Sequence, residues 1–247
     1  MIIVGHRGAR NLWPENSPTG FRKLVQMGVE AVEFDVHPTR EGGLAVIHDA
    51  TLDRTTEGQG KVADYSLAEL AGVRLRDGED TVPSLDAVLD IVAPAGLELH
   101  IEIKTDGAGQ PYPELEAMVM GVVERRGIAA QSILTCFAPQ VLDTLRARWP
   151  AIRLLASLNK AWADRLGGID AALDRFGAID NCLVAVEKSL LAAEWDKCLA
   201  RLGGERLGVW LPNEPTDIEH WMTRPIRQMT TDRPDLALAA RGRLAAH

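Results

Sequence analysis

Short apolar runs and amphipathic stretches alternate along almost the whole chain. Ile2, Ile3 and Val4 form a β-branched run that stops at Gly5, which predicts a short buried strand. Similar runs predict further strands at residues 31–36, 44–47, 97–103, 133–136, 152–155, 182–186 and 207–210. Helical patterns lie between most of these strands, for example at residues 18–27, 85–92 and 114–126. This rhythm predicts a parallel sheet, and about eight strands favour a closed (β/α)8 TIM barrel.

One polar segment interrupts the strand–helix rhythm. Residues 49–81 are rich in polar residues and glycine, and only residues 66–71 show a short helical pattern. Insertions of this kind normally lie at the rim formed by the C-terminal ends of barrel strands, where active sites are found. We therefore expect residues 1–247 to form a single domain with a small insertion at about residues 49–81, after the third strand.

The connection between the strands predicted at residues 31–36 and 44–47 is short for a barrel. A tight hairpin would carry His48 toward the wrong rim, whereas seven extended residues can span roughly 23–25 Å. We therefore predict a parallel crossover without a helix over residues 37–43.

Composition narrows the classes of function. The 247 residues are 46% hydrophobic, which is enough for a barrel-sized core. A net charge of -8 without a basic cluster argues against a nucleic-acid partner. No signal peptide is apparent and no 18 apolar residues run together, so membrane insertion is not expected. Three cysteines without CxxC spacing favour a reducing, cytoplasmic location. The oligomeric state is not indicated.

Polar side chains gather at or near the C-terminal ends of the predicted strands. Side chains alternate across a strand, so Glu33 and Asp35 share one face of theirs, as do Glu102 and Lys104. His6 and Arg7 end the first strand, and His48 ends the run VIHD.

Three inward carboxylates, those of Glu33, Asp35 and Glu102, would be costly in a barrel interior unless a positive group compensates them. A divalent cation does so, and oxygen ligands without cysteine indicate Mg²⁺ or Ca²⁺ as the cofactor. The alternatives are solvated carboxylates at Glu33 and Asp35, and an ordinary ion pair between Glu102 and Lys104.

Structural roles are also open for other candidates. A lone histidine such as His6 is usually a hydrogen-bonded structural residue. Glu15 and Asn16 precede Ser17, the predicted N-cap of the helix at residues 18–27, and could serve only that helix end. The other histidines are predicted to be structural or exposed, and they are His37, His100, His220 and His247.

An ordered set of motifs resembles the glycerophosphodiester phosphodiesterase family. The motifs HRG, PEN, ExD, HDxTLDRTT and ExK stand in GHRGARNLWPENSPTGF, EAVEFDVHPTREGGLAVIHDATLDRTT and LHIEIK, and TTDRPDLAL follows late in the chain. The resemblance covers essentially the whole chain and is strongest over the first 104 residues. It implies a (β/α)8 barrel and hydrolysis of small-molecule glycerophosphodiesters to glycerol 3-phosphate and an alcohol.

The resemblance also implies a role for each motif residue. His6 and His48 would be the general acid–base pair, and Arg7 and Lys104 would hold the phosphate. The divalent metal would be bound by the three carboxylates named above, those of Glu33, Asp35 and Glu102.

Further roles follow from the resemblance outside the core motifs. Glu15 and Asn16 would support the metal and phosphate shell. Trp210 would line the substrate cleft, although a core tryptophan is an equal alternative. The chain departs from the family at Cys136, which replaces a usual serine and is expected to be buried rather than nucleophilic.

The chemistry of phosphodiester cleavage fits these residues. A cation and an arginine stabilise the charge that develops on the phosphoryl oxygens, and two histidines can exchange protons near neutral pH. Because no serine or cysteine stands beside a base in the motifs, attack by the neighbouring substrate hydroxyl through a cyclic phosphate is one hypothesis. A phospholipase C-like barrel lyase and a non-catalytic phosphate-binding module stay open as alternatives.

Overall fold

Eight parallel strands close into a barrel in the computed structural model, which describes residues 1–245. The neighbours follow the order β1-β9-β8-β7-β6-β5-β4-β2, and the pairing of β1 with β2 closes the barrel. The barrel strands are β1 (Ile2–His6), β2 (Ala31–Pro38), β4 (Glu98–Ile103), β5 (Ser132–Cys136), β6 (Arg153–Leu158), β7 (Cys182–Glu187), β8 (Leu207–Trp210) and β9 (Gln228–Thr231). The predicted TIM barrel is confirmed.

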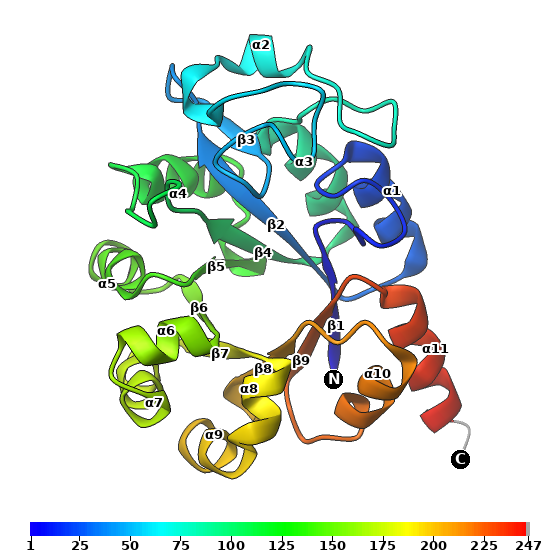
Figure 1. The fold of residues 1–247 in the computed structure, drawn as a ribbon, viewed down its shortest axis with the longest axis vertical. Helices are drawn as coiled ribbons and strands as arrows, with labels where there is room; N and C mark the ends of the chain where they lie inside the picture. The colour runs from blue at the N-terminus through cyan, green and yellow to red at the C-terminus, as the bar shows by residue number, and fades with distance from the viewer. Residues whose placement is uncertain (246–247) are drawn as a thin grey trace.

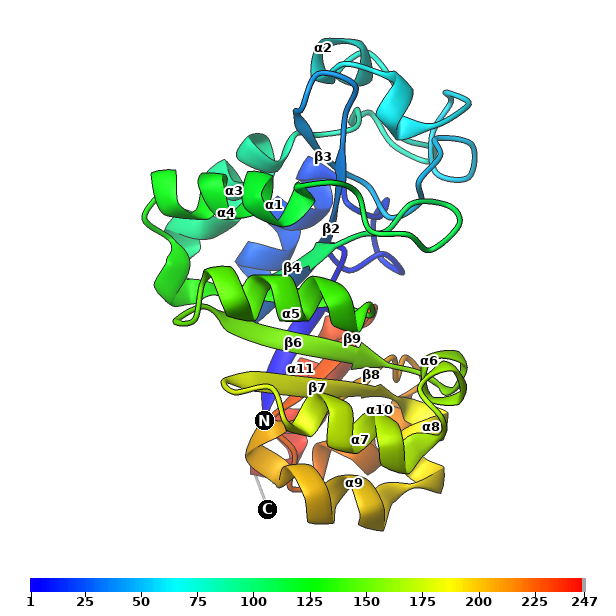
Figure 2. The ribbon, with the colours of Figure 1, turned by 90° about the vertical axis from the view of Figure 1, so that its left-hand side faces the viewer.

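Helices surround the barrel, as Figures 1 and 2 show. They are α1 (Pro18–Met27), α3 (Leu85–Val92), α4 (Leu115–Arg125), α5 (Pro139–Arg148), α6 (Lys160–Arg165), α7 (Ile169–Gly177), α8 (Lys188–Ala193), α9 (Trp195–Leu202), α10 (Pro215–Met222) and α11 (Pro234–Ala245). Short 3₁₀ helices lie at η1 (Val62–Asp64), η2 (Ala93–Ala95), η3 (Ala129–Gln131) and η4 (Gly204–Arg206). Within residues 1–245, no helix combines the length and apolar character that a membrane span requires.

Helix α1 shows how local signals fix an element that positions the site. The Ser17 hydroxyl accepts a hydrogen bond from the Gly20 amide, and Pro18 occupies the first turn, where its missing N–H costs nothing. Gly28 ends the helix with a φ of 77°, a left-handed conformation that favours glycine. Phe21 and Leu24 are buried against the barrel core. The predicted helix at residues 18–27 is therefore confirmed.

Strand β3 (Leu44–Val46) shows that the predicted parallel crossover was wrong. It runs antiparallel to β2, with Val46 opposite Val36 and Leu44 opposite Pro38. The pairing of β1 with β2 ends at His6 opposite Glu33, so the upper part of β2 has a free edge that β3 occupies. The strand predicted at residues 44–47 is present, but it is not a barrel strand.

The hairpin nevertheless brings His48 to the C-terminal rim. The last residues of β2, His37 and Pro38, extend past its pairing with β4, which ends at Val36 opposite Ile103. The chain turns above the rim and returns only to the level of Asp35, whose carbonyl accepts a hydrogen bond from the Ile47 amide at 3.1 Å. The expected conflict between a hairpin and the position of His48 disappears because β2 is longer than the barrel wall.

Residues 39–83 form a projection above the barrel rim that we call the cap (Figures 1 and 2). It contains β3, η1 and α2 (Leu67–Leu70), and α2 begins with a reciprocal capping box between Ser66 and Glu69. The cap has a small hydrophobic core apart from that of the barrel, formed by Ala45, Ile47, Leu52, Val62, Leu70, Leu75 and Val82. The cap therefore packs on its own side chains as well as on the rim.

Candidate active site

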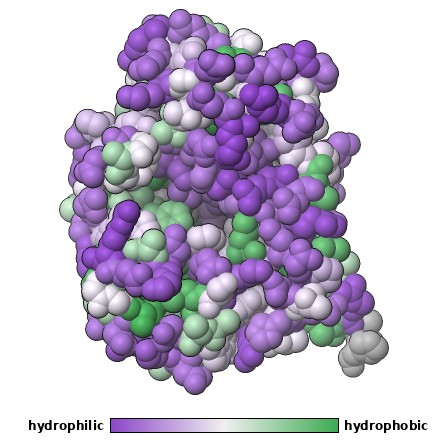
Figure 3. Space-filling model, in the orientation of Figure 1, coloured by the Kyte–Doolittle hydropathy of each residue, from purple (hydrophilic) through white to green (hydrophobic). Residues whose placement is uncertain are grey.

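A cavity of about 250 Å³ opens at the C-terminal ends of the barrel strands. Figure 3 shows a hollow near the centre of this face, with hydrophilic residues on one side and several hydrophobic residues on the other. Six of the residues singled out from the sequence line it, and they are His6, Arg7, Glu33, His48, Glu102 and Trp210. The others lie behind this first layer, and they are Glu15, Asn16, Asp35 and Lys104.

The strand register brings three carboxylates together. Glu33 lies opposite His6 of β1, and Asp35 lies opposite Glu102 of β4. All three are buried, and one oxygen of each lies within 4.8 Å of the other two. The sequence pattern alone predicted that these side chains share the barrel interior.

Two cations partly balance the carboxylates. Arg7 Nε lies 3.1 Å from Asp35 Oδ2, and Lys104 Nζ lies 2.8 Å from Glu102 Oε1 and 3.3 Å from Asp35 Oδ1. Burial alone would raise the pKa of Asp35, but Arg7 and Lys104 hold that pKa well below its usual range. Burial, with Asp35 and Glu102 nearby, raises the pKa of Glu33 well above its usual range. The two cations can balance two carboxylates, and burial and the other carboxylates disfavour a third negative charge at Glu33.

Buried oxygen atoms in this cluster fit a hard divalent cation. Asn16 donates to Asp35 Oδ2 through Nδ2 at 2.9 Å, which leaves its Oδ1 buried without a hydrogen-bond partner among the described residues. Glu33 Oε1 is in the same condition. Unsatisfied buried acceptors beside three carboxylates are the donor set that Mg²⁺ or Ca²⁺ uses. Glu15 instead contacts Arg7 and Arg54.

His6 points one ring nitrogen into the site and the other away from it. Nε2 lies 3.7 Å from Glu33 Oε2, and Nδ1 lies 2.5 Å from Asp232 Oδ1. Burial and the nearby Arg7 guanidinium lower the pKa of His6 despite the Asp232 carboxylate. His6 is therefore neutral at neutral pH and able to accept a proton.

His48 has a similar partner, supplied by the cap. Its Nδ1 lies 2.6 Å from Asp49 Oδ1, and Arg54 donates to both oxygens of Asp49. Arg54 also donates to both oxygens of Glu15, at 3.0 and 2.8 Å. Burial lowers the pKa of His48, while hydrogen bonds from Arg54 and His48 outweigh burial and lower the pKa of Asp49 to about 2. One cap arginine thus ties His48 to the loop that follows β1.

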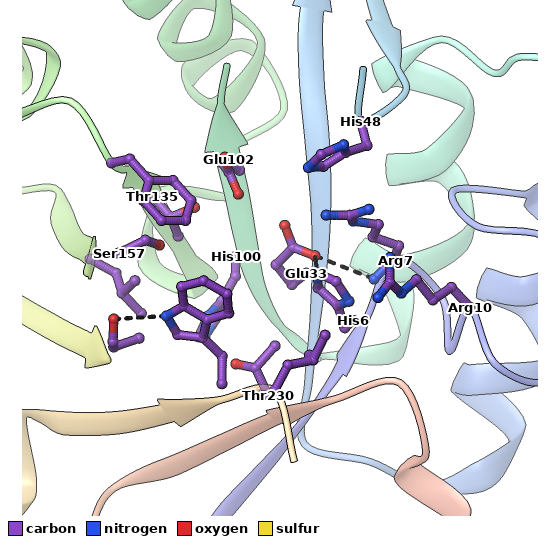
Figure 4. A pocket seen from close by; sticks show the side chains of 15 residues that line it. His6, Arg7, Arg10, Glu33, His48, His100, Glu102, Thr135, Ser157 and Thr230 are labelled. Atoms are coloured by element: carbon purple, nitrogen blue, oxygen red, sulfur yellow. Dashed lines mark hydrogen bonds and ion pairs between the residues drawn. The ribbon is translucent and has the colours of Figure 1, made fainter. Parts of the chain in front are cut away.

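The opposite wall of the cavity is apolar with hydroxyl groups (Figure 4). Phe137 and Trp210 meet edge to face with centroids 5.6 Å apart, and Trp210 Nε1 donates to the Ala185 carbonyl at 3.0 Å. Thr135 and Ser157 add their hydroxyls to the same wall. The cavity therefore has an ionic side and a largely neutral side.

The other predicted histidines have different surroundings. His37 is buried between Tyr112 and the His48 carbonyl. His100 is also buried and bonds to Glu98, but it lines the cavity, which the sequence analysis did not predict. His220 packs edge to face against the ring of Trp221 on α10. His247 lies outside the described residues.

Several site residues were missed from the sequence. Asp49 stands next to His48 in VIHD, so adjacency could have indicated it. Asp232 directly follows β9, which is not among the strands predicted from the sequence, so the strand-end criterion did not reach it. Arg54 lies in the motif HDxTLDRTT, but no role was inferred for it, and no local pattern distinguishes Arg10 from an exposed loop arginine. Cys136 is buried as expected, and burial raises the pKa of its thiol to about 12.

Comparison with known proteins gives a consistent result. The chain is 28% identical over 159 residues to a glycerophosphodiester phosphodiesterase of Caldanaerobacter subterraneus subsp. tengcongensis, a match that covers 62% of this chain and 65% of that protein. It is 32% identical over 159 residues to a glycerophosphodiester phosphodiesterase of Bacillus altitudinis, covering 62% and 64% of the two chains. The matched regions thus span slightly less than two thirds of these relatives.

A solved structure matches over the full length. A protein of Agrobacterium tumefaciens str. C58, assigned as a glycerophosphoryl diester phosphodiesterase, superposes with a TM-score of 0.91 at 27% identity, covering 100% of this chain and 99% of that one. The model of the glycerophosphoryl diester phosphodiesterase family matches residues 6–236, which include every barrel strand except part of β1. With a match of this extent, the chain belongs to the glycerophosphoryl diester phosphodiesterase family.

Proposed function

We propose that this protein hydrolyses glycerophosphodiesters to glycerol 3-phosphate and an alcohol. The observation that carries the proposal is the convergence of His6, His48 and two arginines with two of the clustered carboxylates on one cavity. Family membership supports the same reaction class. A cavity of about 250 Å³ suits a small deacylated diester better than a lipid with its acyl chains.

The ionic side of the cavity would hold the phosphate. Arg7 and Arg10 both line the cavity, and a guanidinium can make paired hydrogen bonds to phosphoryl oxygens. Lys104 is bound to Glu102 and Asp35 and lies behind the lining residues. We propose that Lys104 contributes its charge from there, in support of the phosphate site that the family resemblance implies.

We propose that the cluster of Glu33, Asp35 and Glu102 binds Mg²⁺ or Ca²⁺, with Asn16 Oδ1 close by. When bound, such a cation would supply Lewis-acid stabilisation of charge on the phosphoryl oxygens. Arg7 and the Asn16 amide group fix Asp35, so the ligand geometry is set before substrate arrives. Glu15 supports this shell through Arg7 and Arg54.

We further propose that His6 and His48 act as the acid–base pair. Each has a carboxylate at Nδ1, which leaves Nε2 for the reaction. One would remove the proton from the attacking hydroxyl while the other protonates the leaving alkoxide. The neighbouring hydroxyl of the glycerol is the proposed nucleophile, because intramolecular attack has a high effective molarity and gives a cyclic phosphate that water then opens.

Trp210, with Phe137, would receive the neutral organic part of the substrate. Retention of both histidines and the full carboxylate cluster gives no support to a non-catalytic phosphate-binding module. A cytoplasmic location and a single functional domain over residues 1–247 stay predictions, the first supported by cysteines that are all buried and free.

The test is a coupled assay for glycerol 3-phosphate over a panel of glycerophosphodiesters, with and without EDTA. We expect turnover of at least one diester and its loss in EDTA, with recovery in excess Mg²⁺ or Ca²⁺. Binding of inorganic phosphate without turnover of any diester would contradict hydrolysis. Full activity in EDTA would contradict only the metal assignment.

A further inference from the structure

We propose that Asp232 is a positioning residue that holds His6 in its Nδ1–H tautomer, so that the lone pair of Nε2 faces the cavity. The inference rests on the acid–base role proposed for His6, and it deepens that role by naming the group on which it depends. Asp232 does not line the cavity, so it acts on the reaction through the two lining residues it contacts, His6 and Arg10.

The side chain of Asp232 has no freedom to turn. It follows β9, is fully buried, and meets His6 Nδ1 through Oδ1 at 2.5 Å. Its other oxygen, Oδ2, accepts from Asn213 Nδ2 at 2.8 Å and lies 2.9 Å from Arg10 Nε. The Asp232 amide also donates to Asn213 Oδ1 at 2.9 Å. Both carboxylate oxygens therefore have assigned partners.

This arrangement permits only one neutral form of His6. An ionised carboxylate can only accept hydrogen bonds, so the nitrogen that faces it must carry the hydrogen. In the opposite tautomer, two lone pairs would face each other across 2.5 Å. With the hydrogen on Nδ1, Nε2 is the free acceptor, and it is directed toward Glu33 and the carboxylate cluster (Figure 4).

Replacing the carboxylate by an amide should reverse the tautomer. In Asp232→Asn, the amide oxygen is expected to face the two donors Asn213 and Arg10, because the NH₂ group would clash with them electrostatically. The NH₂ group then faces His6 Nδ1, which must become the acceptor, and the hydrogen moves to Nε2. Asp232→Ala removes the partner without imposing either tautomer.

The experiment combines nitrogen NMR of the histidine side chains with steady-state kinetics. We expect wild-type His6 to carry its hydrogen on Nδ1 and the Asn variant to carry it on Nε2, at a pH where the ring is neutral. The kcat of Asp232→Asn should fall about 100-fold, with KM changed much less. The kcat of Asp232→Ala should fall by a smaller factor. An Nδ1–H tautomer with wild-type kcat in the Asn variant would overturn the proposal.

Two comparisons separate positioning from a general structural effect. In a His6→Ala background, Asp232→Asn should lower kcat no further, because its amide oxygen still faces Arg10 and the rest of its effect passes through the missing ring. A further fall of tenfold or more there would count against the proposal. Asp235→Asn is the matched control, since Asp235 lies on α11 and pairs with Arg233, and neither residue lines the cavity. It should leave kcat unchanged.

The NMR measurement does not depend on turnover. If the wild-type protein hydrolyses no diester, the proposed function fails, while the tautomer of His6 in the wild type and in Asp232→Asn still decides the positioning role. If Asp232→Ala does not fold, because Asn213 and Arg10 lose a buried acceptor, the near-isosteric Asn variant alone carries the test.

Discussion

Replacing Glu33 by Gln should separate two effects of the carboxylate cluster, namely the repulsion among its charges and the binding of a divalent cation. In the folded protein, oxygens of Glu33, Asp35 and Glu102 lie within 4.8 Å of one another. At an effective dielectric constant of about 20, two unit charges at that distance repel by about 3.5 kcal/mol. Arg7 and Lys104 offset most of this repulsion, so we expect Glu33→Gln to stabilise the metal-free protein by about 1–2 kcal/mol when Glu33 is ionised. For a chain of this size, that is about 2–8 °C in Tm.

The stability difference between Glu33→Gln and the metal-free wild-type protein should depend on pH. Burial and two nearby carboxylates raise the folded-state pKa of Glu33 above the unfolded value of about 4.3. The folded state therefore binds more protons in this range, and metal-free wild-type protein should lose stability as pH rises from about 4.3 through the folded pKa. The Gln side chain of Glu33→Gln cannot ionise, so the variant should not lose stability in this way. It should therefore be more stable than the wild-type protein only at a pH above the folded-state pKa of Glu33.

The divalent cation should act in the opposite direction. A ligand present at 100 times its Kd stabilises a protein by about 2.7 kcal/mol, or about 5–11 °C in Tm here. Wild-type protein should show this shift on addition of Mg²⁺ or Ca²⁺, whereas Glu33→Gln should retain less than half of it. The assay is thermal unfolding at pH 8, followed by circular dichroism in EDTA and in the metal at matched ionic strength.

Glu98→Gln is the matched control for charge removal. Glu98 is another carboxylate of the barrel interior, half-buried where Glu33 is buried, and its oxygens pair with His100, Arg153 and Arg227 toward the opposite end of the strands. Removing it should destabilise the protein by about 3–5 kcal/mol in both conditions and leave the metal shift intact. An equal metal shift in Glu33→Gln and wild type would refute the ligand role of Glu33. Lower stability of the metal-free variant at pH 8 would refute the repulsion argument.

Three further outcomes are expected for the proposed reaction. His6→Ala and His48→Ala should each lower kcat about 100-fold or more in steady-state assays, and a wild-type rate would return that histidine to a structural role. Arg54→Met should lower kcat about 10- to 100-fold because Asp49 loses the donor that orients it toward His48. Arg54→Lys should recover only part of this loss. An unchanged kcat in Arg54→Met would show that Asp49 does not depend on Arg54. A substrate without the glycerol hydroxyl next to the phosphate should bind but turn over very slowly, and hydrolysis near the parent rate would indicate direct attack by water.

Features set by local chemistry were predictable from the sequence. The cap of α1 at Ser17 and its end at Gly28 are decided by neighbouring residues, so the helix bounds matched. The alternation in residues 31–36 placed Glu33 and Asp35 on one face, and the barrel rhythm placed that face inward. The inward position of Glu33 and Asp35 follows from these two facts, whereas the meeting with Glu102 also needs the pairing of β2 with β4.

Features set by distant contacts were not predictable in the same way. Strand β3 can pair with β2 from Val36 onward because the pairing of β1 with β2 ends earlier, at Glu33. This difference in strand length is a property of the assembled barrel. Asp232 is separated from His6 by 226 positions, and the two meet because β9 and β1 are neighbours in the closed sheet. The contact between Asp232 and His6 can be predicted only after the pairing of β9 with β1 is known.

Because the hairpin carries His48, the residues of the site are divided between two parts of the fold, each with its own hydrophobic cluster. His6 and the three carboxylates belong to a barrel that closes without β3, whereas His48 is attached to a cap with a small core of its own. Segments with few buried contacts open locally at a lower free-energy cost than the global core. Opening of the cap would withdraw His48 and Arg54 and leave His6, Arg7 and the three carboxylates in the barrel. On gradual heating, catalysis should therefore disappear at a lower temperature than the barrel melts, and reversibly so.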